Sequence, residues 1–199
     1  MVMNDIKNIT VFCGAGSGTK PEYKESAINL GNFLATNNIG LVYGGGATGM
    51  MGAVADGAIS NGGYVKGIIP QFLIDREVAH EDVNEMIIVE TMHERKAALE
   101  EHADAIIMLP GGAGTLEEFF EIFTWGQLGL HDKPIGILNV AGYFDELIAL
   151  MEKLIHEGFL EARFRDLVQV ETDPAQLLEG FKTFTPLSTR TYEDIKDLD

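Results

Sequence analysis

The sequence has one cysteine, few basic residues and no long hydrophobic run, and each shortage excludes a class of protein. Cys13 has no partner for an intramolecular disulfide, which is typical of a reducing compartment. The 14 Lys and Arg face 31 Asp and Glu, so the formal net charge is -17 and neither nucleic acid nor an anionic membrane is expected as main partner. No segment approaches the ~18 apolar residues that span a bilayer, and the N-terminus lacks a signal-peptide core, so we expect a cytoplasmic protein.

Several signatures of catalysis are missing too. The chain has no Gly-Lys-Ser/Thr triplet of a P-loop and no Gly-x-Ser-x-Gly elbow of a serine hydrolase. The five histidines form no His-x-x-x-His pair and no cluster with cysteine, so we expect no metal site. Cys13 is interpreted as a packing residue of a strand, and a nucleophilic role is the less favoured alternative.

What the sequence does contain is a regular alternation of short β-branched runs and helical stretches. This pattern predicts a Rossmann-like α/β fold, a doubly wound parallel sheet with helices on both faces, in a single domain of residues 1–199 with its core at about 7–183 and a polar tail at 189–199. Residues 71–85 have no clear period and are expected to form a long loop or a short helix. The expected strands are Ile9–Cys13, Gly40–Tyr43, Tyr64–Ile69, Met86–Val89, Ala105–Leu109, Ile135–Leu138 and Leu167–Val170. The expected helices are Pro21–Asn37, Met50–Asn61, Met92–His102, Leu116–Leu130, Tyr143–His156 and Ala175–Thr183.

Glycine is abundant, with 23 residues or about 12% of the chain against a typical ~7%. Nearly half of these glycines fall in three loops, at residues 14–18, 44–52 and 111–114, and each loop joins an expected strand to an expected helix. In a doubly wound sheet ligands bind beyond the carboxyl ends of the strands, where helix N-termini attract anions. We therefore expect the three helix starts to converge on one phosphorylated ligand.

The first two loops each have a competing interpretation. Residues 14–20 carry hydroxyls and a lysine that suit a phosphate or a nucleotide, and a tight strand-to-helix turn is the less favoured alternative. Residues 44–49 match the dinucleotide pattern G-x-G-x-x-G, but the acid expected about 20 residues later is missing from Gly67–Gln71. An NAD-dependent oxidoreductase is therefore a minority interpretation, whereas close approach of this backbone to some nucleotide is favoured over packing alone.

The third loop, residues 109–118, is the most informative. Its glycines expose main-chain N–H groups, and Thr115 adds a hydroxyl at the expected helix start. Thr115 and Glu118 also match a capping box, a purely structural alternative. Chemistry is favoured because Glu117, Glu118 and Glu121 crowd one helix start beside a predicted anion site.

Two adjacent cations, Arg95 and Lys96, stand near the start of another expected helix, where the helix dipole disfavours positive charge. An anionic partner explains them. Lys96 has an equally good alternative partner in Glu100, four residues on. Arg95 has no carboxylate at that spacing, which favours a ligand or Glu118 as its partner.

These residues together resemble the Lonely Guy family of cytokinin riboside 5'-monophosphate phosphoribohydrolases, long labelled possible lysine decarboxylases. The resemblance covers about residues 7–183 and rests on Arg95-Lys96, on the P-G-G-x-G-T-x-x-E pattern from Pro110 to Glu118, and on the glycine motifs at 43–46 and 49–52. It implies hydrolysis of the N-glycosidic bond of an adenosine 5'-monophosphate, free or N6-substituted, by a homodimer that needs no metal or organic cofactor. The decarboxylase label finds no support, because no lysine lies in the context of a pyridoxal phosphate site.

The resemblance also implies residue roles. Arg95 and Glu118 are the catalytic pair, in which Arg95 either keeps Glu118 ionised or holds the phosphate. A non-catalytic nucleotide or cofactor carrier on the same fold is the alternative function. The apolar helix 116–130 is the candidate dimer surface, and its aromatic residues are expected in the core or that interface. The implied substrate contacts are Glu77, Lys96, Gly112, Ala113, Gly114, Thr115, Leu116, Glu117 and Thr124, and the glycine loops add Gly14, Ser17, Gly44, Gly45 and Gly46.

Overall fold

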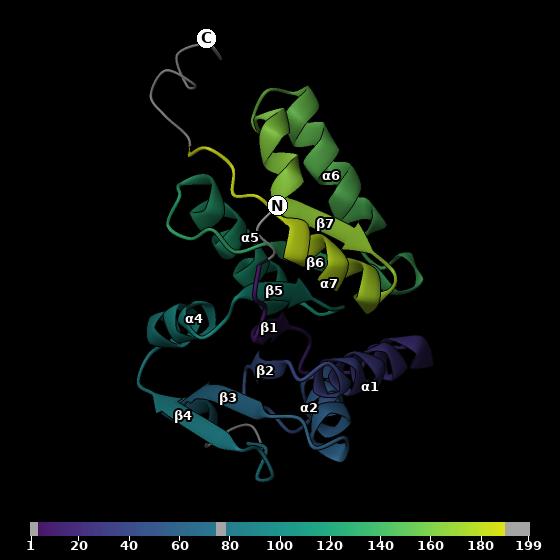
Figure 1. Cartoon of the computed structure of the whole chain (residues 1–199), viewed down its shortest axis with the longest axis vertical. Coiled ribbons are helices and arrows are strands. Elements are labelled where there is room, and N and C mark those ends of the chain that lie inside the picture. The colour runs from purple at the N-terminus through teal and green to yellow at the C-terminus, as the bar shows by residue number, and fades with distance from the viewer. Residues whose placement is uncertain (1–3, 75–78, 190–199) are drawn as a thin grey trace.

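Seven parallel strands form one sheet through the middle of the molecule (Figure 1), in the order β4-β3-β2-β1-β5-β6-β7. The computed structural model describes residues 4–74 and 79–189. Buried β-branched and aliphatic residues dominate the central strands, as expected of a parallel sheet covered on both faces. The strands are β1 (Asn8–Phe12), β2 (Gly40–Tyr43), β3 (Val65–Pro70), β4 (Glu85–Val89), β5 (Ala105–Met108), β6 (Ile135–Leu138) and β7 (Val168–Glu171).

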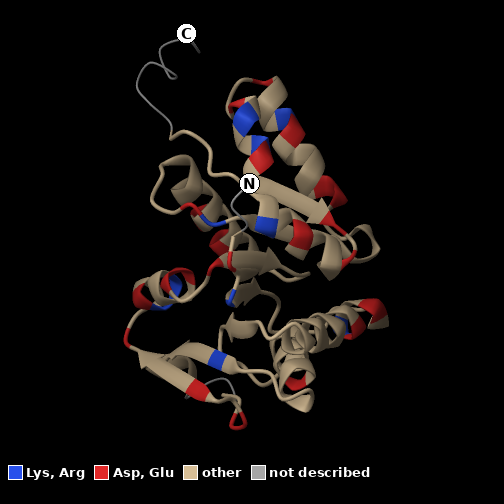
Figure 2. Cartoon of the chain, in the orientation of Figure 1, with Lys and Arg blue, Asp and Glu red and all other residues tan. Residues whose placement is uncertain are grey.

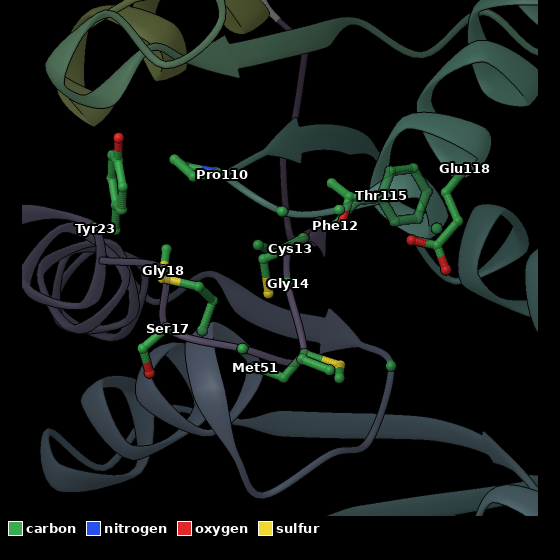
Figure 3. A pocket seen from close by; sticks show the side chains of 18 of the residues that line it. Phe12, Cys13, Gly14, Ser17, Gly18, Tyr23, Met51, Pro110, Thr115 and Glu118 are labelled. Atoms are coloured by element: carbon green, nitrogen blue, oxygen red, sulfur yellow. The ribbon is translucent and has the colours of Figure 1, made fainter. Parts of the chain in front are cut away.

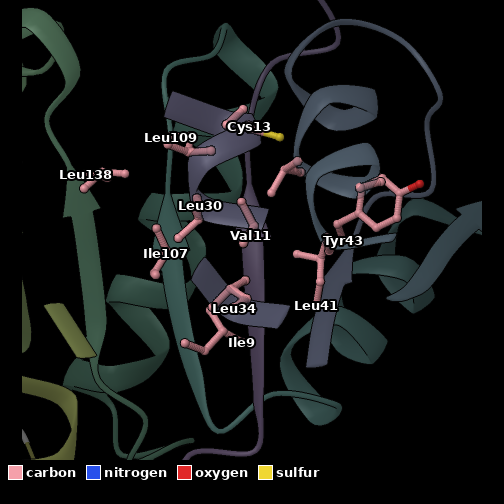
Figure 4. Packing of buried hydrophobic residues seen from close by; sticks show 14 of the residues in the cluster. Ile9, Val11, Cys13, Leu30, Leu34, Leu41, Tyr43, Ile107, Leu109 and Leu138 are labelled. Carbon is pink, nitrogen blue, oxygen red and sulfur yellow. The ribbon is translucent and has the colours of Figure 1, made fainter. Parts of the chain in front are cut away.

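Helices cover both faces of the sheet and divide the core in two. On β1, Ile9 and Val11 belong to one hydrophobic cluster and Phe12 to the other, because successive side chains of a strand point to opposite faces. Figure 4 shows Leu30 and Leu34 of α1 packed in the first cluster. The helices are α1 (Pro21–Thr36), α2 (Gly49–Ser60), α3 (Gln71–Ile74), α4 (Met92–Glu101), α5 (Ala113–Gln127), α6 (Asp145–His156) and α7 (Pro174–Thr183), with 3-10 turns η1 (Val140–Gly142) and η2 (Ala162–Leu167).

The chain winds outward from β1 in one direction and then crosses to β5 to wind outward in the other. The strand order therefore reverses between β1 and β5, which is where open α/β sheets form their ligand crevice. The loops after these two strands lie together, and the amide of Gly14 donates a 3.1 Å hydrogen bond to the carbonyl of Pro110.

The predicted fold is confirmed, including all seven strands and all six helices. The largest difference in a helix start is at α5, which begins at Ala113 rather than at Leu116. The short helix α3 occupies part of the segment 71–85, and the two 3-10 turns were not predicted. In the described ranges, none of the helices is long and apolar enough to span a membrane.

Candidate active site

A cavity of about 600 Å³ lies beyond the carboxyl ends of β1 and β5, at the reversal of the strand order. Its size is within the ~300–1,000 Å³ typical of small-molecule sites. Figure 3 shows Thr115 and Glu118 of α5 on one side, and Ser17, Gly18 and Tyr23 on the other. The lining consists of Val11, Phe12, Cys13, Gly14, Ala15, Gly16, Ser17, Gly18, Tyr23, Gly44, Met50, Met51, Leu73, Arg95, Leu99, Pro110, Gly111, Gly112, Gly114, Thr115, Glu118 and Tyr143.

One cation and one anion face each other in this lining. Nη1 of Arg95 lies 3.7 Å from Oε1 of Glu118, and both residues are buried. The guanidinium is also fixed by the sheet, because Nε donates to the carbonyl of Ile68 and Nη2 to that of Gly44, each at 3.2 Å. Acidic residues are spread over both halves of the molecule (Figure 2), so a buried cation in the cavity is a marked local exception.

The environment of Glu118 changes its acidity. Burial raises the pKa of its carboxyl from 4.5 to about 7, and the positive charge of Arg95 only partly opposes that rise. Near neutral pH the carboxyl therefore exchanges between its protonated and ionised forms. A carboxyl poised in this way is common where a protein needs an acid, a base or a switchable negative charge.

The first turn of α5 brings to the cavity backbone N–H groups that have no partner among the described residues. Gly112 is the N-cap and makes no side-chain capping bond. The amides of residues 112–115 have no acceptor within the part of the chain that the structure describes, and Gly112, Gly114 and Thr115 line the cavity. Unpaired amides and the positive end of the helix dipole together suit an anion.

The capping-box alternative for Thr115 and Glu118 is wrong. Because α5 begins at Ala113, Thr115 lies inside the helix, and Glu118 is turned toward Arg95. A capping box is present instead at Thr91 and Glu94, at the start of α4, where each side chain accepts from the other's backbone.

Lys96 makes its contacts outside the cavity. Its Nζ lies 2.6 Å from Oε1 of Glu117 and 3.0 Å from Oε1 of Glu121, so it joins α4 to α5. These two carboxylates raise the pKa of Lys96. The alternative pairing with Glu100 is wrong, since Glu100 pairs with Lys133 at 2.6 Å.

The backbone of the second glycine loop makes several contacts within the protein. The carbonyl of Gly44 holds Arg95, that of Gly45 accepts from His80, and Gly46 forms a bridge with Ala79. At the start of α2, the amides of Met50 and Met51 donate to the carbonyl of Gly14, at 3.1 and 3.3 Å. The start of α2 therefore reaches the cavity, as expected, but two of its amides are already used within the protein.

The predicted site residues divide into those at the cavity and those beside it. Eight line it: Arg95, Glu118, Gly112, Gly114, Thr115, Gly14, Ser17 and Gly44. Glu77 lies outside the described residues. Seven others lie outside the lining, of which Thr124 is exposed and Leu116 is half-buried: Lys96, Ala113, Leu116, Glu117, Thr124, Gly45 and Gly46.

Sequence reasoning missed most of the apolar and aromatic lining. Tyr143 follows β6 at the carboxyl edge of the sheet, a position that would have nominated it. Tyr23 follows the first glycine loop by five residues, and Met50 and Met51 lie within the second, which is a weaker signal. Cys13 also lines the cavity, but burial raises the pKa of its thiol, which favours the packing interpretation.

Comparison with known proteins supplies independent information. A family model described as "Possible lysine decarboxylase" matches residues 51–181. The chain is 43% identical, over 93% of its length and 87% of the relative's, to the cytokinin riboside 5'-monophosphate phosphoribohydrolase LOG1 of Arabidopsis thaliana. It is 41% identical, over 98% of its length and 80% of the relative's, to the probable cytokinin riboside 5'-monophosphate phosphoribohydrolase LOGL2 of Oryza sativa subsp. japonica.

A solved structure is also similar. The molybdenum cofactor carrier protein of Chlamydomonas reinhardtii aligns with a TM-score of 0.68, over 89% of this chain and 96% of that one, at 21% identity. At such identity the likeness establishes the Rossmann-like fold and nothing about the ligand.

Proposed function

We propose that this chain, which belongs to the Lonely Guy family of cytokinin riboside 5'-monophosphate phosphoribohydrolases, hydrolyses the N-glycosidic bond of adenosine 5'-monophosphates with a free or N6-substituted base. The observation that carries the proposal is the juxtaposition in one cavity of the Arg95–Glu118 pair and the unpaired amides of α5. The first supplies groups for bond cleavage, and the second supplies a site for a phosphate.

The 5'-phosphate binds at the N-terminus of α5 in this proposal. The amides of Gly112 and Gly114, with the amide and hydroxyl of Thr115, offer donors that no described residue occupies. Hydrogen bonds from amides to an anion are stronger than those between neutral groups. The nucleotide is thereby anchored by its phosphate, with its ribose toward Glu118.

Glu118 acts on the ribose. When the bond between the base and C1' breaks, its electron pair leaves with the base and positive charge develops on the ring. The ionised carboxyl of Glu118 stabilises that charge and orients a water, whose oxygen bonds to C1'. One proton of that water passes to the carboxyl and from there to the nitrogen of the departing base. The products are the free base and ribose 5-phosphate.

Arg95 serves as the partner of Glu118. Two backbone carbonyls hold its guanidinium in place, and its remaining nitrogen approaches the carboxyl at 3.7 Å. A fixed positive charge favours the ionised form of a carboxyl that burial would otherwise keep protonated. Arg95 also lines the cavity, and holding a bound phosphate stays its alternative role.

Two other activities fit these residues less well. Pyridoxal-phosphate chemistry requires a lysine for the Schiff base, and none of the lysines of the described segments lines the cavity. A non-catalytic carrier on the same fold would need the cavity and the amides of α5, but not a carboxyl whose pKa lies about 7 beside a buried arginine.

The decisive experiment incubates the purified protein with AMP and with isopentenyladenosine 5'-monophosphate, and separates the products by chromatography. We expect free base and ribose 5-phosphate in equal amounts from one or both nucleotides. Binding of both nucleotides without release of base would support the carrier instead. The ratio of kcat/KM for the two substrates measures the base preference.

We propose further that the protein is a cytoplasmic homodimer. Phe119, Ile122 and Phe123 of α5 are buried in the chain's own core, and Leu116, Phe120 and Trp125 are partly buried against it, so only part of the predicted dimer surface is available to a second copy. Leu128 and Leu130 remain exposed at its end. Light scattering on the purified protein at several concentrations tests the mass, and a monomer at all of them contradicts the proposal.

A further inference from the structure

Tyr143 occupies a fixed position at the rim of the cavity. Its ring makes edge-to-face contacts with Tyr23 and Phe144, with centroids 5.5 and 4.9 Å apart. Its hydroxyl donates a 2.5 Å hydrogen bond to the carbonyl oxygen of Gly111. The side chain is thus held at both ends although the residue is 40% exposed, so its orientation is set before any ligand arrives.

Tyr143 follows a turn that contains two residues in the left-handed conformation. Ala141 and Gly142 have φ values of 51° and 70°, and for the alanine this left-handed conformation is unfavourable. The side chain of Asn139 stabilises the turn, because it accepts from the amide of Phe144 at 2.8 Å and donates to Asp145 at 2.7 Å. Strain of this kind persists only where the surrounding contacts enforce it.

The hydrogen bond to Gly111 has a consequence for the next residue. Gly111 and Gly112 share a planar trans peptide, in which the carbonyl and the N–H point in opposite directions. A group that fixes the carbonyl of Gly111 therefore also fixes the direction of the N–H of Gly112. That N–H has no acceptor among the described residues, and Gly112 lines the cavity.

We propose that Tyr143 is a positioning residue for phosphate recognition, which aims the N–H of Gly112 at the 5'-phosphate by holding the carbonyl of Gly111. The inference rests on the proposed function in one respect, namely that a phosphorylated ligand binds at the start of α5. Glycine at position 112 leaves this peptide free to rotate, so an external hydrogen bond is needed to select one orientation.

Tyr143→Phe tests the proposal, since it removes the hydroxyl and keeps both ring contacts. We expect the Kd of ribose 5-phosphate and the KM of AMP to rise about tenfold, as for loss of one charge-assisted hydrogen bond. The kcat should change less than about twofold, because the interaction is the same in ground and transition states. The Kd of adenosine, which lacks the phosphate, should not change.

Tyr64→Phe is the matched control. Its hydroxyl also makes a 2.5 Å hydrogen bond, to Glu85, but it lies outside the cavity lining. We expect this variant to bind ribose 5-phosphate and adenosine as the wild type does. Ribose 5-phosphate affinity that is unchanged in Tyr143→Phe, or adenosine affinity weakened to the same degree, would overturn the proposal.

A measurement without turnover keeps the two proposals separable. Inorganic phosphate titrated into ¹⁵N-labelled protein should shift the amide resonance of Gly112 in the wild type, and shift it less in Tyr143→Phe. If AMP is not hydrolysed but this difference is seen, the proposed function fails and the role of Tyr143 stands. If AMP is hydrolysed and the Gly112 resonance responds equally in both proteins, only the role of Tyr143 fails.

Discussion

The helices α2 and α5 start alike and serve different purposes. Each follows a parallel strand and a glycine-rich loop at the same edge of the sheet. At α2, the carbonyl of Gly14 accepts from the amides of Met50 and Met51, whereas at α5 the amides from Gly112 to Thr115 have no acceptor in the described ranges. A glycine-rich helix start is therefore available to a ligand only where the protein leaves its amides unpaired.

The glycines of the two helices differ in the same way. A Cβ on Gly52 of α2 would overlap the backbone carbonyl of Ala47, so the chain itself uses the space. A Cβ on Gly112 or Gly114 would meet no atom of the described residues within 4 Å. The glycines of α2 permit close packing of the backbone, whereas Gly112 and Gly114 at the start of α5 leave space that no described residue fills.

The largest effect is expected at α5. Glu118→Gln keeps the size of the side chain but removes its negative charge, so we expect kcat for AMP to fall by about 10³-fold while the Kd stays within about threefold. Product chromatography and calorimetry measure the two quantities. Glu179→Gln, on the exposed side of α7, is the control and should behave as the wild type. Near-normal turnover in Glu118→Gln would reduce Glu118 to a buried structural residue.

A large loss of stability is expected at α2. Gly52→Ala places a methyl group against the carbonyl of Ala47, which cannot move without disturbing the start of the helix. We expect the free energy of unfolding to fall by about 3 kcal/mol. Urea denaturation followed by circular dichroism measures it. An unchanged midpoint would show that the packing at α2 is looser than its geometry indicates, and would weaken the contrast with α5.

The stability contributed at α5 should depend on pH. The pKa of Glu118 is raised from 4.5 to about 7 in the folded protein, so its protonated form stabilises the fold below pH 4.5 and that contribution is lost as the pH rises through 7. Between pH 5 and 8 the wild type should lose about 2 kcal/mol relative to Glu118→Gln. Denaturation of both proteins at each pH isolates this group. Parallel pH profiles would contradict the raised pKa.

The smallest effect is expected from Gly114→Ala, which tests substrate binding at α5 separately from stability. Gly114→Ala adds a methyl group where the protein has open space, so stability should stay within about 1 kcal/mol of the wild type. If a phosphate approaches this backbone, the same methyl group should raise the KM of AMP about tenfold. Thermal unfolding and initial rates measure both. An unchanged KM would show that the phosphate does not bind beside Gly114.

The fold could be predicted because its strands and helices follow from patterns of neighbouring residues in the sequence. Strands of a parallel sheet are buried on both faces and must be rich in aliphatic residues, as Ile106 and Ile107 illustrate, and the glycine loops follow them directly. The start of α5 was misjudged for a local reason as well. Thr91 and Thr115 are each followed three residues on by glutamate, but only the first forms a capping box, because Gly112 begins the second helix earlier.

The site was less predictable because its decisive contacts join distant segments. The sequence indicated that Arg95 and Glu118 belong together, but not that carbonyls of β3 and of the loop after β2 fix the guanidinium. Nor could it show that the carbonyl of Gly14 closes the start of α2 while the start of α5 stays open. Such differences depend on where backbone carbonyls point in the folded protein.

The neighbouring pairs Arg95-Lys96 and Glu117-Glu118 have a joint consequence. Arg95 pairs with Glu118 inside the cavity, and Lys96 pairs with Glu117 outside it. The helices α4 and α5 are therefore joined by two neighbouring ion pairs, an inner and an outer one. The outer ion pair is partly exposed, so dissolved salt screens its electrostatic attraction, whereas the inner ion pair is buried. The two helices are therefore joined by a close pair at 2.6 Å outside the cavity as well as by the buried pair at 3.7 Å inside it, so residues that do not line the cavity also hold α4 against α5.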